Sequence, residues 1–190
     1  PLSHGTGAVA LSGVTALVGI RDIGKVKPDD RILVSGAAGG VGSHVAAIAK
    51  ALGAGNVVGV AGGAEKCRRL RSEMAYDHVI DYKNEDVDRE LSLAFPEGID
   101  LYFDNVGGTL LDNVLSRLRR RARIVICGAI SEYLVDTADK HHFVNLQNLG
   151  RQDAKMEGFF VFDYEEQYPE CIETLAGWIR AGTLNPIEHI

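Results

Sequence analysis

The chain has 190 residues and a formal net charge of −6 at pH 7, with acidic and basic side chains interspersed. This length suits one domain with a single hydrophobic core. The charge provides no basic field for nucleic acid, and no polybasic cluster accompanies an amphipathic helix, so we expect neither a nucleic-acid nor a membrane partner. No apolar run approaches the ~20 residues that a membrane span needs.

The cysteines and histidines do not suggest a metal site. Cys67, Cys127 and Cys171 are widely spaced and form no CxxC pair, whereas structural zinc sites and redox dithiols use close pairs. His141 and His142 are adjacent, without carboxylate or thiol ligands at useful spacing, and we interpret them as surface residues. We expect reduced thiols, no bound metal and a cytoplasmic location.

The order of predicted elements indicates the fold class. Residues 5–24 have the spacing of a helix, and apolar runs alternate with helical patterns after residue 30. Strands are predicted at residues 31–36, 56–62, 77–82, 98–106, 122–129 and 156–164. Helices are predicted at residues 40–53, 64–74, 85–95, 109–119 and 165–182, with a polar loop after residue 129. This alternation is typical of an α/β fold, a Rossmann-type doubly wound parallel sheet with helices on both faces.

The stretch VSGAAGGVGSHVAAIAK, residues 34–50, has the order strand, tight turn, helix. Its glycines would permit positive φ angles and let the backbone approach a pyrophosphate, while the helix would point free N–H groups and its positive dipole end at that anion. A second strand ends about twenty residues on, as a dinucleotide-binding fingerprint requires, and no GK[ST] follows that would make a P-loop. A methyltransferase has a similar turn and stays an alternative.

The end of the second strand indicates which dinucleotide binds. NAD sites usually place Asp or Glu there, but this strand ends in AGG, residues 61–63. A 2′-phosphate is therefore not repelled, and Lys66 follows, with Arg68 and Arg69 nearby to meet its charge. The pattern favours NADP over NAD and counts against a methyltransferase. The alternative for Lys66 is an ordinary exposed helix lysine.

No common catalytic motif is present. None of the six tyrosines has a lysine four residues later, and neither GxSxG nor HExxH occurs. The remaining candidates lie in the loops after the fourth and fifth strands, where ligands bind in open α/β sheets. Asn105 follows the fourth strand and Tyr133 lies in the loop after the fifth. Tyr133 is the candidate that would donate a hydrogen bond or proton, with an exposed loop tyrosine as the alternative.

The motifs LSGVTAL, VSGAAGGVGS, GVAGGAEKC, IDYKNED, GIDLYFDNVGG, RIVICGAIS and KMEGFFVFDY occur in order along most of the chain. With them the chain resembles the zinc-independent branch of the medium-chain dehydrogenase/reductase superfamily, and most closely NADP-dependent oxidoreductases akin to prostaglandin, 2-alkenal and curcumin reductases. The resemblance implies an enzyme that reduces the carbon–carbon double bond of α,β-unsaturated ketones or aldehydes by hydride transfer from NADPH. Residues 133–150 follow the family poorly, so substrate contacts there are the least certain expectation.

The resemblance also implies a two-domain subunit, in which a GroES-like domain packs on the dinucleotide-binding domain and the active site lies between them. Residues 1–190 are then the NADP-binding domain, with the N-terminal catalytic domain and the C-terminal end outside this sequence. We expect the isolated fragment to bind the cofactor without turnover. Family dimers form by extension of the sheet, so the segment FFVFDY is expected at an edge that pairs with a second subunit; a covered edge in a monomer is the alternative.

Carried over position by position, the resemblance implies roles for residues of this chain. The diphosphate would lie on Ala38, Gly39, Gly40 and Val41. The 2′-phosphate region would contain Gly62, Lys66 and Tyr82, and Asn105 would lie near a ribose. The nicotinamide side would be flanked by Cys127, Gly128, Ala129, Ile130 and Ser131. The carboxamide would meet the backbone of Phe159, Phe160 and Val161, and Tyr133 would face the substrate as the catalytic residue.

Two alternative functions remain open on these residues. An NADPH-dependent quinone reductase would use the same hydride and nearly the same site, and no residue separates the two activities. A non-catalytic NADPH-binding regulatory module would bind the cofactor but would not oxidise it, whichever substrate is offered. Both alternatives keep NADP as the cofactor.

Overall fold

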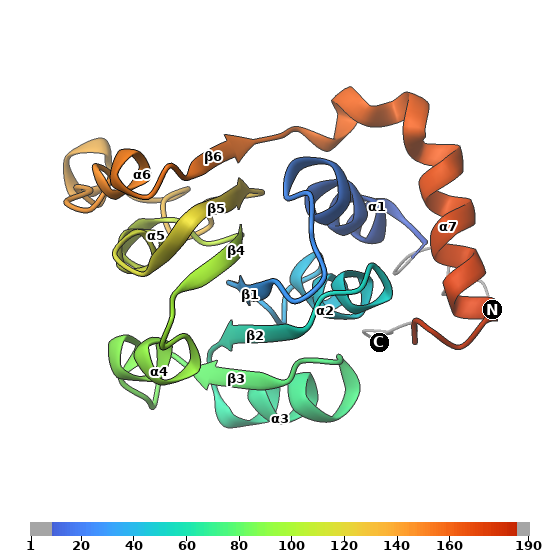
Figure 1. Cartoon of the computed structure of the whole chain (residues 1–190), viewed down its shortest axis with the longest axis horizontal. Coiled ribbons are helices and arrows are strands. Elements are labelled where there is room, and N and C mark those ends of the chain that lie inside the picture. The colour runs from blue at the N-terminus through green and yellow to red at the C-terminus, as the bar shows by residue number, and fades with distance from the viewer. Residues whose placement is uncertain (1–8, 186–190) are drawn as a thin grey trace.

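The computed structural model describes residues 9–185, and its centre is a six-stranded parallel sheet with the order β3-β2-β1-β4-β5-β6 (Figure 1). The strands are β1 (Arg31–Val34), β2 (Asn56–Ala61), β3 (His78–Asp81), β4 (Ile99–Asp104), β5 (Leu118–Ile126) and β6 (Lys155–Gly158). The strand order reverses between β1 and β4, and the chain winds outward from this pair in both directions. The predicted doubly wound α/β fold is confirmed.

The strands are rich in Val and Ile because both faces of the sheet are buried. In β1, Ile32 and Val34 belong to one core cluster and Leu33 belongs to the other. Residues that alternate along a strand point to opposite faces, so each of the strands β1 to β5 contributes to both cores, whereas the four residues of β6 are exposed. A parallel sheet covered in this way leaves mainly its two ends open to a ligand.

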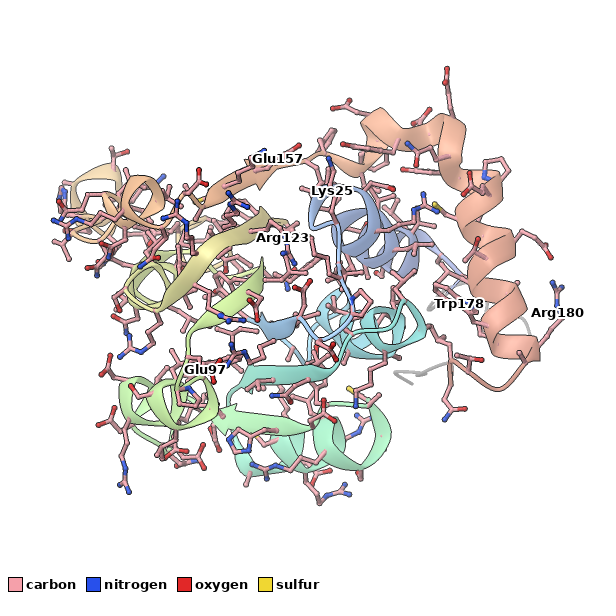
Figure 2. The ribbon with its side chains drawn as sticks, in the orientation of Figure 1. Lys25, Glu97, Arg123, Glu157, Trp178 and Arg180 are labelled. Carbon is pink, nitrogen blue, oxygen red and sulfur yellow. The ribbon has the colours of Figure 1, made fainter. Side chains whose placement is uncertain are left out.

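The helices divide between the two faces of the sheet. They are α1 (Leu11–Val18), α2 (Gly42–Ala51), α3 (Ala64–Glu73), α4 (Val87–Ala94), α5 (Gly108–Leu115), α6 (Asn148–Arg151) and α7 (Tyr168–Arg180). Buried residues of α1, α2, α3 and α7 join the first core cluster, and those of α4 and α5 join the second. Figure 1 shows α1 and α7 to the right of the sheet and α4 and α5 to the left. In Figure 2, Trp178 lies on the side of α7 that faces the body and Arg180 on the opposite side.

The predicted first helix is confirmed for the described residues, and its predicted start at residue 5 lies outside them. Helix α1 begins at Leu11 and continues into a π-helical turn, Gly19–Ile23. This turn passes close to the sheet, because a Cβ on Gly19 would stand 2.5 Å from the ring of Phe103. No helix within residues 9–185 is long and apolar enough to cross a membrane.

The prediction of a strand through residues 156–164 is wrong in its second half. Strand β6 ends at Gly158, and Val161–Gln167 forms 3₁₀ turns instead. The apolar run FFVFDY does not continue along the sheet because the Phe159 ring packs edge-on to Tyr164, with centroids 6.2 Å apart, and the Tyr168 hydroxyl donates to the Val161 carbonyl at 3.1 Å. The segment therefore folds back toward α1 and α7.

The basic run at residues 117–123 belongs mainly to β5, whereas the helical pattern predicted residues up to 119 as helix. Helix α5 ends at Leu115, and β5 begins at Leu118. The arginines meet acidic partners: Arg119 pairs with Asp100 at 3.1 Å, and Arg123 pairs with Asp30. Figure 2 labels Arg123 on β5 and Glu97 near α4. These pairs offset part of the positive charge of the run.

Candidate functional site

A cleft of about 840 Å³ lies along the carboxyl ends of β1, β2, β4 and β5. Thirteen of the residues predicted from the sequence line it: Ala38, Gly39, Gly40, Val41, Gly62, Lys66, Tyr82, Asn105, Cys127, Gly128, Ile130, Ser131 and Tyr133. These positions come from the segments that follow five strands, β1 to β5, with Tyr82 contributed by the segment after β3. The parallel order brings the loops together because all the strands end at the same side of the sheet.

The turn between β1 and α2 forms the floor of the cleft. A Cβ on Gly42 would stand 2.3 Å from the Gly36 carbonyl oxygen, so only glycine lets α2 begin this close to the turn. Gly36 itself has a φ of +57°, in the left-handed region. Within residues 9–185 the backbone amides of Gly40, Val41 and Gly42 have no protein acceptor, as expected for a helix start. This surface presents N–H groups to an anion and has no side chain in the way.

A buried carboxylate holds this turn against the neighbouring loop. Asp104, at the end of β4, is fully buried, and its Oδ1 accepts from the Ser35 hydroxyl and the Tyr102 hydroxyl, each at 2.7 Å. The same oxygen accepts from the backbone amides of Val106 at 2.9 Å and Gly107 at 3.0 Å. Burial and the neighbouring carboxylate raise the pKa of Tyr102 well above its ordinary value, so this hydroxyl stays protonated and donates. The result is a rigid link between β1 and β4.

Asn105 extends this link to the surface of the cleft. Its side-chain amide donates to the Ser35 carbonyl at 2.7 Å, and its backbone amide donates to the Ser35 hydroxyl at 2.9 Å. Sequence reasoning placed Asn105 at the site but missed Ser35, Tyr102 and Asp104. Their partners lie up to 70 residues away in the chain, so only the adjacency of β1 and β4 makes them a network.

The end of β2 forms the second region of the cleft. The Tyr82 ring lies against Gly62, with ring carbons 2.6 Å from where a Cβ on Gly62 would stand, and its side chain is 55% exposed. The Gly63 amide donates to Asp81 Oδ1 at 2.8 Å, and Asn84 donates to Oδ2 at the same distance. The Gly63 hydrogen bond, together with that of Asn84, lowers the pKa of Asp81. Asp81 is therefore ionised, and both of its carboxylate oxygens accept hydrogen bonds that hold this loop.

Lys66 is a cation at this end of the cleft that has no partner among the described residues. Arg68 is paired with Glu65 and Arg69 with Glu73, whereas Lys66 has no ion pair or side-chain hydrogen bond within residues 9–185. Lys66 lies on the first turn of α3 and lines the cleft. Its ammonium group can therefore bind an anionic ligand without first breaking an ion pair.

The loop after β5 closes the other end. The amides of Cys127 and Gly128 donate to the Asp104 carbonyl at 2.8 and 3.1 Å, and the Ser131 hydroxyl donates to the Val106 carbonyl at 2.6 Å. Burial, with a contribution from the Asp104 charge, raises the pKa of the Cys127 thiol to about 11. The thiol is therefore neutral at physiological pH and is not poised as a nucleophile.

Tyr133 lies over this loop and is 65% exposed. Its hydroxyl oxygen accepts from the Ala129 amide at 3.0 Å and would stand 2.9 Å from a Cβ on Gly128. An accepted hydrogen bond leaves the phenolic proton free to be donated into the cleft. Ala129 does not itself line the cleft, but it orients the residue that does.

Phe159, Phe160 and Val161 do not line the cleft. They follow β6, whose last residue Gly158 is paired with Ile126 of β5. The Phe160 side chain is 62% exposed and lies 5.1 Å, ring to ring, from Phe162. The three residues lie beyond the β5 edge of the cleft and not in its wall.

The cleft has a further wall that the sequence did not reveal. Val87, Thr109, Leu110 and Asn113 line it from the start of α4 and from α5. A smaller hollow of about 400 Å³ adjoins it and shares Val106, Thr109, Leu110 and Ser131. Helical periodicity marked α5 as a covering helix and carried no signal that one of its edges faces a ligand. Within residues 9–185, no group of three or more His, Cys, Asp or Glu side chains is arranged to hold a metal ion.

Comparison with known proteins extends these observations. The profile of the family described as zinc-binding dehydrogenase matches residues 40–177. The chain is 42% identical to YfmJ of Bacillus subtilis (strain 168), named as an NADP-dependent oxidoreductase, over 100% of this chain and 56% of that protein. It is 40% identical to an NADP⁺-dependent 2-alkenal reductase of Nicotiana tabacum, over 100% of this chain and 55% of that protein. The chain thus spans about half the length of these relatives.

Solved structures agree with this result. The crystal structure of CurA from Vibrio vulnificus in complex with NADPH superposes with a TM-score of 0.88 and 36% identity, over 96% of this chain and 55% of that chain. A quinone oxidoreductase of Escherichia coli, also solved with NADPH, has a TM-score of 0.76 and 28% identity, over 92% of this chain and 52% of that chain.

Proposed function

This chain belongs to the zinc-binding dehydrogenase family, among its NADP-dependent oxidoreductases, and from that premise we propose that it is the NADPH-binding part of an enone and alkenal reductase. The whole enzyme reduces the carbon–carbon double bond of α,β-unsaturated ketones and aldehydes. One observation carries the proposal: the glycine turn and Lys66 lie in one cleft, with amides and an ammonium group that have no protein partner in the described part of the chain, and β2 between them ends without a carboxylate.

The residues of the cleft fit such a cofactor in order. Residues 38–41 hold the diphosphate through backbone amides, because Gly36 and Gly42 let α2 begin close against the turn and so bring its free N–H groups to the floor of the cleft. Lys66, with the ring of Tyr82 beside it, meets the 2′-phosphate. Asn105 lies by a ribose, and residues 127–131 flank the nicotinamide. Residues 159–161 lie outside the cleft, so their expected contact with the carboxamide is not part of this proposal.

The chemistry requires little of the protein beyond placement and a proton donor. NADPH supplies the hydride. The glycine turn orients the diphosphate half of the bound cofactor, and the loop after β5 orients the nicotinamide half. Because the backbone lies close to the cofactor at both places, water is excluded from the cofactor faces that it covers. Negative charge develops on the substrate oxygen during reduction of an enone, and a donor aimed at that oxygen stabilises it. Tyr133 is the donor that this chain offers, since its proton is not used in the Ala129 contact.

The proposal is tested by measuring the affinity of the protein for NADPH and for NADH. We expect the protein to bind NADPH more tightly, and Lys66→Ala to weaken NADPH binding by about 10- to 100-fold, since hydrogen bonds to charged groups contribute about 1.5–3 kcal/mol. NADH affinity should stay unchanged in Lys66→Ala. Lys83→Ala is the matched control, and it should change the affinity for neither cofactor because Lys83 does not line the cleft. Equal affinities for the two cofactors in the unaltered protein would contradict the proposal.

Quinone reduction is the second candidate, supported by the structural similarity to a quinone oxidoreductase. It uses the same cleft, so steady-state rates with an alkenal, an enone and a quinone separate the two activities. A full-length protein that binds NADPH and turns over none of these substrates would instead be a regulatory module.

We also propose a homodimer in the cytoplasm. All four residues of β6 are exposed, and β6 is the last strand of the sheet, so its outer edge has backbone groups ready to pair with a second copy. The three free cysteines suit a reducing compartment. Light scattering on the full-length protein measures its mass in solution and so tests whether it is a dimer.

A further inference from the structure

Helix α3 carries three arginines besides Lys66, and they are not equivalent. Arg68 makes a two-point contact with Glu65, at 3.0 and 2.6 Å, and Arg71 donates to the Val79 carbonyl at 2.8 Å. Arg69 makes a single contact, from its Nε to Glu73 at 3.0 Å. Arg69 and Arg71 therefore each make one side-chain hydrogen bond and keep other N–H groups to use, and what distinguishes Arg69 is its position.

Arg69 also faces the ligand. Residues three apart on a helix lie on the same side, so Lys66 and Arg69 are neighbours. Both line a hollow of about 300 Å³ together with Ala38, Gly40 and Met74. Ala38, Gly40 and Lys66 line the main cleft as well, so this hollow opens beside the glycine turn at the Lys66 end. Arg68 lines neither of them, and its guanidinium is held by Glu65, so the sequence-based expectation that Arg68 also meets the phosphate charge is not confirmed.

We infer that Arg69 is a second cation for the 2′-phosphate. It is paired with Glu73 in the absence of the cofactor and exchanges this partner for the phosphate when NADPH binds. This inference rests on the proposed NADPH function. A phosphate monoester carries about −1.5 to −2 charges at pH 7, which one ammonium group does not neutralise. A guanidinium adds two parallel N–H donors in the geometry that phosphate oxygens accept. The exposed pair with Glu73 is weak enough to exchange, because an i,i+4 ion pair in water contributes little.

The arrangement explains why Glu73 is useful. Without a ligand, its carboxylate keeps Arg69 ordered at the rim of the hollow and offsets part of its charge. A bound 2′-phosphate offers two charges in place of one, so the guanidinium moves to it. A cofactor without that phosphate leaves Arg69 on Glu73, and Arg69 then discriminates between NADPH and NADH in addition to Lys66.

The test measures dissociation constants for NADPH and NADH with the full-length protein and its variants. Arg69→Ala should weaken NADPH binding by about 10-fold, as expected for loss of a hydrogen bond to a charged group, and leave NADH unchanged. Arg69→Lys should retain part of the affinity. Arg68→Ala is the matched control and should change neither constant, and Glu73→Gln should tighten NADPH binding because the competing carboxylate is removed.

The outcomes separate this inference from the proposed function. If the unaltered protein prefers NADPH and Lys66→Ala reduces that preference while Arg69→Ala behaves like Arg68→Ala, the inference is overturned and the proposed function stands. An equal loss of NADPH and NADH affinity in Arg69→Ala also overturns it, because a structural effect would act on both. If the unaltered protein shows no preference for NADPH, the proposed function and the inference fail together.

Discussion

The glycine turn at the floor of the cleft, here called its rigid end, and the loop after β5, here called its open end, are built in different ways. At the β1–α2 turn the backbone is locked by a fully buried carboxylate, Asp104, and by a contact at Gly42 that admits no side chain. The loop after β5 is open: Tyr133 is 65% exposed and Leu134 is fully exposed. The difference indicates a division of labour. The part that meets the constant portion of a dinucleotide is rigid, and the part that faces the substrate is supported only at its base.

The loop does have one anchor of its own. Asp112 of α5 is buried, and its carboxylate accepts from the Asn145 amide at 2.9 Å, the Val144 amide at 3.3 Å and His141 Nε2 at 3.1 Å. Asp104 and Asp112 are thus two buried carboxylates, one under each end of the cleft. Asp104 joins two strands of the sheet, whereas Asp112 joins a helix to a mostly exposed loop. Variants at the two ends should therefore affect different properties.

The largest effect is expected from Gly42→Ala at the rigid end. The new methyl group would meet the Gly36 carbonyl oxygen at 2.3 Å, and this atom belongs to the backbone, so it cannot rotate away as the end of a flexible side chain would. Overpacking of this kind typically costs about 1–3 kcal/mol, and we expect the upper end of that range, with loss of NADPH binding. Urea unfolding and cofactor titration measure the two effects.

Gly177→Ala in α7 is the control for Gly42→Ala, because a Cβ there meets nothing within 4 Å. It should stabilise the helix by about 0.5–1 kcal/mol and leave cofactor affinity unchanged. Equal stability of the two variants would show that the glycine turn is less tightly built than its geometry indicates.

Asp104→Asn should have the next largest effect. The change removes the charge that four donors share at Oδ1 and places an amide N–H₂ opposite the Gly107 amide, which also contacts Oδ2 at 3.2 Å. Hydrogen bonds to charged groups contribute about 1.5–3 kcal/mol, so we expect a loss of about 2 kcal/mol in the free energy of unfolding and weaker NADPH binding. Asp112→Asn should cost less and leave NADPH affinity unchanged. A reversed order of the two variants would contradict the comparison.

The same two ends differ in how far sequence reasoning reached. The glycine turn was predicted because its signal is local: strand, glycines and helix follow one another in 34–50. Lys66 was found in the same way, three residues after the strand-end glycines. The Asp104 network was missed because Ser35 and Asp104 lie 69 residues apart and meet only when β1 and β4 are adjacent.

The loop after β5 was the least predictable part. Asp112 and Asn145 lie 33 residues apart, and neither belongs to a recognisable motif. The strand expected at 156–164 failed for a related reason. The apolar run in FFVFDY fits a buried strand, but Gly19 leaves a space that the Phe159 ring approaches, and this contact directs the chain away from the sheet. Local patterns predict elements, whereas the ends of elements depend on what they pack against.

The smallest effect is expected at the open end, as a pH-dependent release of the loop. Burial would raise the pKa of Asp112, but the hydrogen bonds from the Asn145 amide, His141 and the Val144 amide together lower it below the ordinary range. A carboxyl group whose pKa is lower in the folded state contributes stability that is complete above its unfolded pKa, about 3.9, and is lost as the pH falls through the lower folded value. The loop should therefore stay anchored at neutral pH and detach only in acid.

Pepsin cleavage measures this release, because pepsin is active in acid and Phe143 and Leu146 are partly exposed in the anchored segment. The cleavage rate near these residues in the unaltered protein should rise toward that of Asp112→Asn as the pH falls below about 4, since protonation removes the same charge as the substitution does. The ratio of the two rates cancels the enzyme's own pH profile. A ratio that stays constant from pH 5 to pH 2, roughly the interval over which the anchor should be lost, would mean that the Asp112 charge does not hold the loop, and that the open end of the cleft has no anchor that acid can release.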